Sequence, residues 1–313
     1  MALRMSTAPH IRSGETTRRI MADVLIALVP CVIAGVYRFG LSAALLIAVC
    51  LFTSVLSEFV WFKLSKRPMR VNDLSALVTG LILALNLPPT TSWWVAAIGC
   101  VFAIILVKQL FGGIGDNFVN PAIAARAALL ASWPVQMTTF ILPLNSATAT
   151  AVDAVTSATP LSTGSAEYWN LFVGNIPGSI GEISKLMIIV GLLYLLIRKV
   201  ITPVVPLCML AGTALMSWIL GGDPLAAILS GGVMFGAVFM ATDYTTSPMT
   251  TKGQVVYAFG AGIIVSIIRK YGAYPEGVTY AILVMNIVTP LIDKYMKPKL
   301  FGRPQKEAAA KEA

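Results

Sequence analysis

The sequence predicts an all-α polytopic membrane protein with about ten transmembrane helices, arranged as two inverted five-helix halves. Composition is the first observation: 57% of the 313 residues are hydrophobic and only 12% are charged, about half the charge of an ordinary soluble domain. The second is the recurrence of apolar runs that approach the roughly 20 residues needed to cross a bilayer. The third is a weak internal repeat.

Apolar runs between polar segments give the expected helices in order. The run Asn86-Leu87-Pro88-Pro89 ends one of them, and Pro134 interrupts another. Such breaks are tolerated at membrane depth where protein or a cavity surrounds them. The expected helices are 22–37, 41–64, 71–87, 93–111 and 121–143 in the first half, and 185–200, 203–220, 225–242, 254–270 and 277–296 in the second.

These helices divide the chain into five parts. They are a tail at 1–21, a first five-helix half at 22–143, a loop at 144–184, a second five-helix half at 185–297 and a tail at 298–313. The loop is rich in Ser, Thr, Gly and Ala and contains no Lys or Arg. A loop of this length is usually functional or disordered.

The distribution of basic residues sets the expected orientation. With the N-terminus inside, 18 of the 23 Lys and Arg residues fall in inside segments. Lys108 is among these inside residues. Four fall outside, namely Arg38, Lys185, Arg269 and Lys270, and Arg126 lies within a span. Short cytoplasmic loops are enriched in Lys and Arg, so both termini are expected in the cytoplasm and the 144–184 loop on the outer face of the bacterial inner membrane. The net charge of +9 then reflects anchors on anionic lipid rather than nucleic-acid binding.

The repeat pairs one segment from each half. Residues 94–112 and 255–272 are both apolar helices closed by basic residues, an aromatic and a glycine, and Gly80 corresponds to Gly231-Gly232 upstream. The copies are five spans apart, which inverts the second relative to the first. Inverted repeats place ligands at the interface between halves, often at interrupted helices.

Metal and histidine chemistry are not expected. The only histidine, His10, lies in the polar N-terminal tail, and the four cysteines are far apart within apolar runs. We interpret those cysteines as packing residues and predict no metal site.

Three polar segments could carry chemistry. The segment Thr156-Ser157-Ala158-Thr159 precedes Pro160 in the outside loop, and by itself it is also compatible with an ordinary solvated turn. In the segment 112–122, glycines allow close backbone approach, and Asn117 and Asn120 offer both donors and acceptors. One of these asparagines is expected to cap the helix that starts at Pro121.

Two charged residues stand out near or within the spans. Asp243 lies in the third segment, 239–250, and we select it as a candidate for ion or flavin-associated binding because carboxylates at membrane depth are often functional. Arg126 lies one turn beyond Ala122. It is expected either to reach the cytoplasmic interface with its long side chain or to contact a flavin or phosphate group.

Together these motifs resemble one family over nearly the whole chain. The family contains the D subunit of the Rnf electron-transport complex and the B subunit of the sodium-translocating NADH:quinone oxidoreductase, and the Rnf branch is the nearer match. Its Ser/Thr-x-Ala-Thr motif is similar to residues 156–159 and its Gly-x-Asn-x-x-Asn-Pro-Ala motif to residues 115–122. Further similarities are at 9–12, 239–250 and 274–277.

The resemblance implies specific cofactors. In the family, the last Thr of the first motif carries FMN through a phosphoester bond, which here is Thr159, with Thr156, Ser157 and Ala158 as its motif. The second motif implies non-covalent riboflavin near the cytoplasmic side, with Asn117 and Asn120 as contacts.

The resemblance also implies a function within a complex that couples electron flow between ferredoxin and NAD to Na⁺ or H⁺ movement. This chain has no nicotinamide motif and no iron–sulfur ligands, so it is not catalytically complete alone. Other membrane and peripheral subunits, including iron–sulfur and NADH- or ferredoxin-reactive ones, are implied, with a flavin transferase for maturation. The alternative is a solute channel or transporter, which a five-plus-five inverted repeat would suit equally well.

Overall fold

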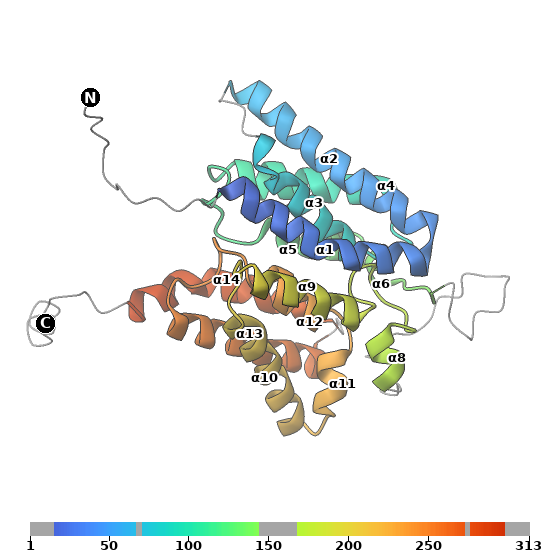
Figure 1. Cartoon of the computed structure of the whole chain (residues 1–313), viewed down its shortest axis with the longest axis vertical. Coiled ribbons are helices and arrows are strands. Elements are labelled where there is room, and N and C mark those ends of the chain that lie inside the picture. The colour runs from blue at the N-terminus through green and yellow to red at the C-terminus, as the bar shows by residue number, and fades with distance from the viewer. Residues whose placement is uncertain (1–15, 67–70, 144–167, 273–275, 298–313) are drawn as a thin grey trace, which may run out of the picture.

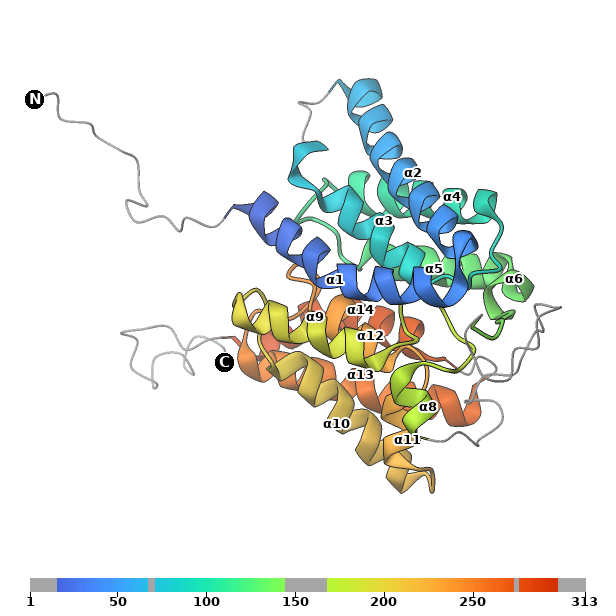
Figure 2. The same cartoon turned by 45° about the vertical axis from the view of Figure 1, so that its right-hand side comes forward.

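The structure is a computed structural model, which describes residues 16–66, 71–143, 168–272 and 276–297. The described residues form helices joined by short connections, without a β-strand. Figures 1 and 2 show two layers of helices, one from each half of the chain.

The first layer follows the expected order of helices. Each of the five expected ranges contains helix, and the last range divides into two helices at Trp133–Pro134, where the proline begins α6. The elements are α1 (Thr17–Phe39), α2 (Leu41–Ser65), η1 (Val71–Asp73), α3 (Ser75–Leu85), α4 (Trp93–Val101), η2 (Phe102–Gln109), α5 (Pro121–Ser132) and α6 (Pro134–Thr138).

The second layer contains one helix that was not expected and one expected helix that is broken. α8 (Tyr168–Val173) lies within the range predicted as loop, and the expected helix at 225–242 is interrupted at Ser230–Gly232. The other elements are α9 (Lys185–Ile197), α10 (Val204–Ile219), α11 (Pro224–Leu229), α12 (Val233–Phe235), η3 (Gly236–Met240), α13 (Thr251–Tyr271) and α14 (Val278–Tyr295).

The apolar character of the helices makes this a multi-pass membrane protein. Among the described residues, α1, α2 and α13 are long and apolar enough to cross a bilayer, and five further apolar helices have 10–17 residues. The helices of the second group are shorter than the roughly 20 residues of a typical span, so the expected count of ten full spans is not reproduced helix by helix. The connection 86–89 after α3 is buried, as expected where protein surrounds a broken helix.

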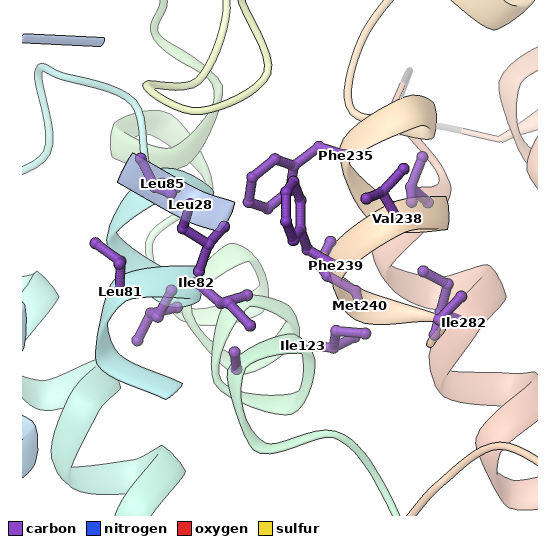
Figure 3. Close-up of a cluster of buried hydrophobic side chains, with 14 of the residues drawn as sticks. Leu28, Leu81, Ile82, Leu85, Ile123, Phe235, Val238, Phe239, Met240 and Ile282 are labelled. Carbon is purple, nitrogen blue, oxygen red and sulfur yellow. The ribbon is translucent and has the colours of Figure 1, made fainter. Parts of the chain in front are cut away.

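An apolar core joins the two layers. Leu28, Ile82 and Ile123 of the first half face Phe235 and Phe239 of the second (Figure 3), and all five side chains are buried. The Phe235 and Phe239 rings are 5.1 Å apart between centroids. Close packing of this kind holds the halves in one arrangement.

A buried segment between α8 and α9 also connects the layers. Ile180 donates its backbone N–H to the Leu87 carbonyl at 3.1 Å, and Gly181 donates to the Leu85 carbonyl at 2.7 Å. These bonds satisfy backbone groups beyond the end of α3. Residues 176–184 of the predicted 144–184 loop are therefore packed into the protein, α8 exposes Tyr168 and Trp169, and 144–167 lie outside the described residues.

Two short stretches have π-helical hydrogen bonding. At the end of η2, Leu110 N–H donates to the Ile105 carbonyl at 3.1 Å, and at the end of η3, Ala241 N–H donates to the Gly236 carbonyl at 2.8 Å. Each bond spans five residues instead of four. Such stretches are rare and are frequent at functional sites.

Candidate functional site

A pocket lies between the two halves where η2 and η3 end. Its walls come from α1, α3, η2 and the start of α5 in the first half, and from α9, η3 and the following connection in the second. The space is ≈ 860 Å³ when the open solvent at its mouth is included. Val78, Ile82, Val238 and Phe239 provide apolar walls.

Asn120 lies on the wall of this pocket and caps α5. Its side-chain oxygen accepts from the backbone N–H groups of Ala122 at 3.0 Å and Ile123 at 3.4 Å, and Pro121 occupies the first helical position. The expected cap is thus confirmed and belongs to Asn120. Its amide nitrogen donates to the Met240 carbonyl at 3.4 Å, across the interface between the halves.

Asn117 lines the same pocket and is less constrained. Its amide nitrogen donates to Thr245 Oγ1 at 3.2 Å, and its side-chain oxygen has no donor among the described residues. Three glycines with positive φ, Gly112, Gly113 and Gly115, let the chain turn back from η2 and bring Asn117 to the pocket.

Asp243 completes the polar part of the pocket from the second half. Its Oδ2 accepts hydrogen bonds from Thr245 Oγ1 at 3.1 Å and Thr246 Oγ1 at 3.3 Å. Burial raises the pKa of Asp243 above its usual value, and the hydrogen bonds from the two threonines oppose that rise. The structure therefore brings Asn117, Asn120 and Asp243 together, although they are up to 126 positions apart in the sequence.

Lys108 and Ser75 also line the pocket, and the sequence analysis did not select them. Lys108 was assigned to a cytoplasmic anchor because it is the basic residue at the end of an apolar helix. Instead its side chain is buried and pairs with Glu58 at 2.7 Å. The position of this lysine shortly before the glycine-rich turn at 112–115 was the signal in the sequence that could have identified it as a site residue.

Arg126 does not line the pocket. Its guanidinium is buried, donates to Asn86 Oδ1 at 2.9 Å and forms an ion pair with Glu276. The side chain thus neither reaches the cytoplasmic interface nor contributes to the candidate site. It links α5 to the connection before α14 in the second half.

Lys185 and Arg269 were counted as outside loop residues but are internal as well. Lys185 is 0% exposed and donates to the Gly231 carbonyl at 2.9 Å. Arg269 donates to the carbonyls of Ala227 and Ser230. These cations satisfy backbone oxygens freed where the helix breaks between α11 and α12.

The segment Thr156-Ser157-Ala158-Thr159 lies outside the described residues. The pocket is therefore the part of the candidate site for which the structure gives positions and contacts. Apolar walls with amide groups along one side suit a flat conjugated ring that carries both donors and acceptors. The side-chain oxygen of Asn117, which accepts no hydrogen bond from the described residues, offers an acceptor to such a ring.

Fold and pocket together define a helical membrane protein with a candidate ligand pocket between its two halves. Comparison with known proteins specifies this class further. The chain belongs to the NQR2, RnfD, RnfE family, which it matches over residues 4–302.

Named relatives match the chain along nearly its full length. It is 49% identical to the D subunit of the Na⁺-translocating ferredoxin:NAD⁺ oxidoreductase complex of Acetobacterium woodii, over 98% of each chain. It is 41% identical to the D subunit of the proton-translocating ferredoxin:NAD⁺ oxidoreductase complex of Clostridium ljungdahlii, over 95% of this chain and 96% of the relative. The D subunit of the ion-translocating oxidoreductase complex of Halorhodospira halophila is 38% identical over 94% of each chain.

Proposed function

We propose that this chain is the membrane flavoprotein subunit of an ion-translocating, ferredoxin- and NAD-linked oxidoreductase complex. The similarity to these relatives over nearly the whole chain carries this proposal, because partial matches would support only a shared fold. In such a complex the chain would pass electrons while partner subunits supply the ferredoxin, NADH and iron–sulfur sites. The relatives named for Na⁺ and for protons leave the ion open.

The proposal includes two flavins. FMN would be attached through its phosphate to the hydroxyl of Thr159 by a flavin transferase, on the outer face of the inner membrane. The second, non-covalent riboflavin, would occupy the pocket, with Asn117 and Asn120 along its polar edge. A bound flavin supplies the electron-carrying chemistry, and the protein positions it and adjusts its potential.

The residues of the pocket favour this assignment in three ways. Asn117 retains an acceptor oxygen toward the pocket, and Asn120 is held rigidly by its capping bonds. The apolar walls exclude water from the faces of a ring. Asp243, together with Thr245, would fix the Asn117 amide and is our candidate for an ion or flavin-associated role.

Intact-protein mass spectrometry tests the covalent flavin. We expect the chain from a host with the flavin transferase to carry the added mass of one FMN, and a fluorescent band that persists after denaturation. Thr159→Ala should abolish both, because it removes the acceptor hydroxyl. Thr156→Ala should leave some flavin attached. A bare polypeptide from the wild-type chain would contradict the proposal and favour a transporter.

Flavin extracted from the purified chain without hydrolysis tests the pocket. We expect Asn117→Ala to reduce extractable riboflavin severalfold while the covalent band is unchanged. For Asn120 the matched pair is Asn120→Ala and Asn120→Asp, since Asp preserves the helix cap but replaces the donor amide. Loss in both variants assigns a flavin contact, whereas loss only in the alanine variant would mean that Asn120 acts through α5.

A further inference from the structure

Lys108 is an unusual component of the pocket wall. It lies at the end of η2, and its side chain is 4% exposed in the interior of a membrane protein. Burying a cation at this depth is costly and usually marks a functional position. Cytoplasmic anchoring, the ordinary use of a lysine at a helix end, would place its ammonium group at the membrane surface.

The partners of Lys108 compensate its charge only in part. Its Nζ donates to Glu58 Oε1 at 2.7 Å and to Ser75 Oγ, and Ser75 in turn donates to Asp73 Oδ1 at 2.7 Å. An ammonium has three donor hydrogens, so one has no acceptor among the described residues. Lys108 and Ser75 both border the pocket, whereas Glu58 lies behind them on α2.

Glu58 is also incompletely satisfied. Gln109 donates to the same oxygen, Oε1, at 2.8 Å, and Oε2 has no hydrogen-bond partner among the described residues although it is buried. A carboxylate and an ammonium are thus held one behind the other at the pocket wall. A change of charge at this pair has a strong electrostatic effect in the pocket, because the protein interior screens charges weakly.

We propose that the Glu58–Lys108 pair sets the reduction potential of the flavin in the pocket, with Lys108 favouring the reduced ring and Glu58 opposing it. This inference rests on the proposed function, since it needs a flavin in the pocket. An isoalloxazine ring that takes up two electrons and one proton gains one negative charge. The ammonium attracts that charge, and the carboxylate behind it reduces the attraction.

The signs of the expected effects separate this role from a purely structural one. Replacing Glu58 by Gln keeps a hydrogen-bond acceptor for Lys108 and removes the negative charge, so the potential should rise. Replacing Lys108 by Met keeps the length of the side chain and removes the positive charge, so the potential should fall. A pair that only anchors α2 to η2 would alter occupancy in both variants without opposite shifts in potential.

The experiment is a redox titration of the full-length chain in detergent, with dithionite and mediators, followed by flavin absorbance. Thr159→Ala is the background, because it removes the covalent FMN signal and leaves the pocket flavin. We expect at least a tenfold change in the oxidised-to-reduced equilibrium in each direction, which is about 30 mV for a two-electron couple. The double variant Glu58→Gln with Lys108→Met should return toward the parent value.

Two further variants keep the outcome decisive. Glu276→Gln removes the negative charge of a different carboxylate, which pairs with Arg126 away from the pocket. This variant should leave the reduction potential of the flavin unchanged. Lys108→Arg should retain a potential near the parent value even if Lys108→Met does not fold. Equal potentials in the parent and Glu58→Gln, with flavin bound, would overturn this inference alone. Absence of non-covalent flavin from the wild-type chain would overturn the pocket assignment and this inference with it.

Discussion

Arg126 and Glu276 illustrate what charged residues do inside this protein. The two side chains come from different halves, and Arg126 also holds Asn86 beyond the end of α3. Removing one member of a buried pair leaves the other charge uncompensated, which costs about 3–5 kcal/mol. A single substitution in this pair is therefore expected to weaken the interface between the two halves.

We predict that Arg126→Met lowers the thermal stability of the purified chain, measured as the midpoint of heat-induced aggregation in detergent. The expected loss is at most about 3–5 kcal/mol, the cost for a fully buried pair, because Glu276 is 18% exposed and would lose its main cation. The double variant Arg126→Met with Glu276→Gln should recover part of that loss. Lys270→Ala, at an exposed position at the end of α13, is the control and should change little. A single variant as stable as its control would show that the pair does not hold the halves.

For single residues, the sequence indicated which polar side chains line the pocket better than it indicated which residues they contact. Asn117, Asn120 and Asp243 could be selected because amides and carboxylates beside glycines and prolines are recognisable locally. Lys108 was assigned to the cytoplasmic interface, and Arg126 either to that interface or to a flavin or phosphate contact, because nothing local reveals that Glu58 and Glu276 lie within reach. An ion pair between residues 50 or 150 positions apart is a property of the packing.

At the scale of elements, glycines determine how closely the helices pack. A Cβ at Gly262 of α13 would meet the Met209 carbonyl and, at 2.7 Å, the Thr213 amide nitrogen of α10. Gly212 of α10 makes the reciprocal approach to the Phe259 carbonyl. Helices inside membranes associate through such small residues, because apolar burial alone does not distinguish protein from lipid.

We predict that Gly262→Ala separates α10 from α13 and destabilises the protein by about 1–3 kcal/mol. Gly260 on the same helix is the matched control, since an added Cβ there would meet only the flexible end of Met285, at 3.1 Å. Gly260→Ala should be neutral or slightly stabilising, as alanine is the better helix former. Thermal midpoints in detergent, with yield of monodisperse protein, measure both. Equal effects of the two substitutions would mean that the α10–α13 contact is not close.

The break between α11 and α12 marks the limit of prediction for elements. Residues 225–242 form a nearly continuous apolar run, and a helix was the natural expectation. Gly231 instead adopts a positive φ of 59°, which only glycine accepts easily. Arg269 and Lys185 supply the donors that stabilise the open turn, and both come from other helices. Positions of helices follow from hydropathy, but breaks in them depend on distant donors.

At the scale of the whole molecule, the two layers have a defined direction. α1 begins and α14 ends at one end of the molecule, whereas α6, α8 and α11 gather at the other (Figures 1 and 2). The pocket opens among the start of α1, the end of α9 and the connection after η3, at the end where the chain enters and leaves. The sequence predicted the two halves, and only the structure places the pocket between them.

Our last prediction concerns orientation in the membrane. Since α1 begins and α14 ends at the same end of the molecule, fusions there should report the same side, and the excess of basic residues in those segments predicts that this side is the cytoplasm. Green fluorescent protein fused after Ala313 should fluoresce, and alkaline phosphatase fused there should be inactive. Phosphatase fused within 144–167 should be active, because α6 and α8, which flank that segment, lie at the opposite end. Fusions reading the same side at both positions would contradict this arrangement, and a cytoplasmic 144–167 would also place Thr159 away from the outer face.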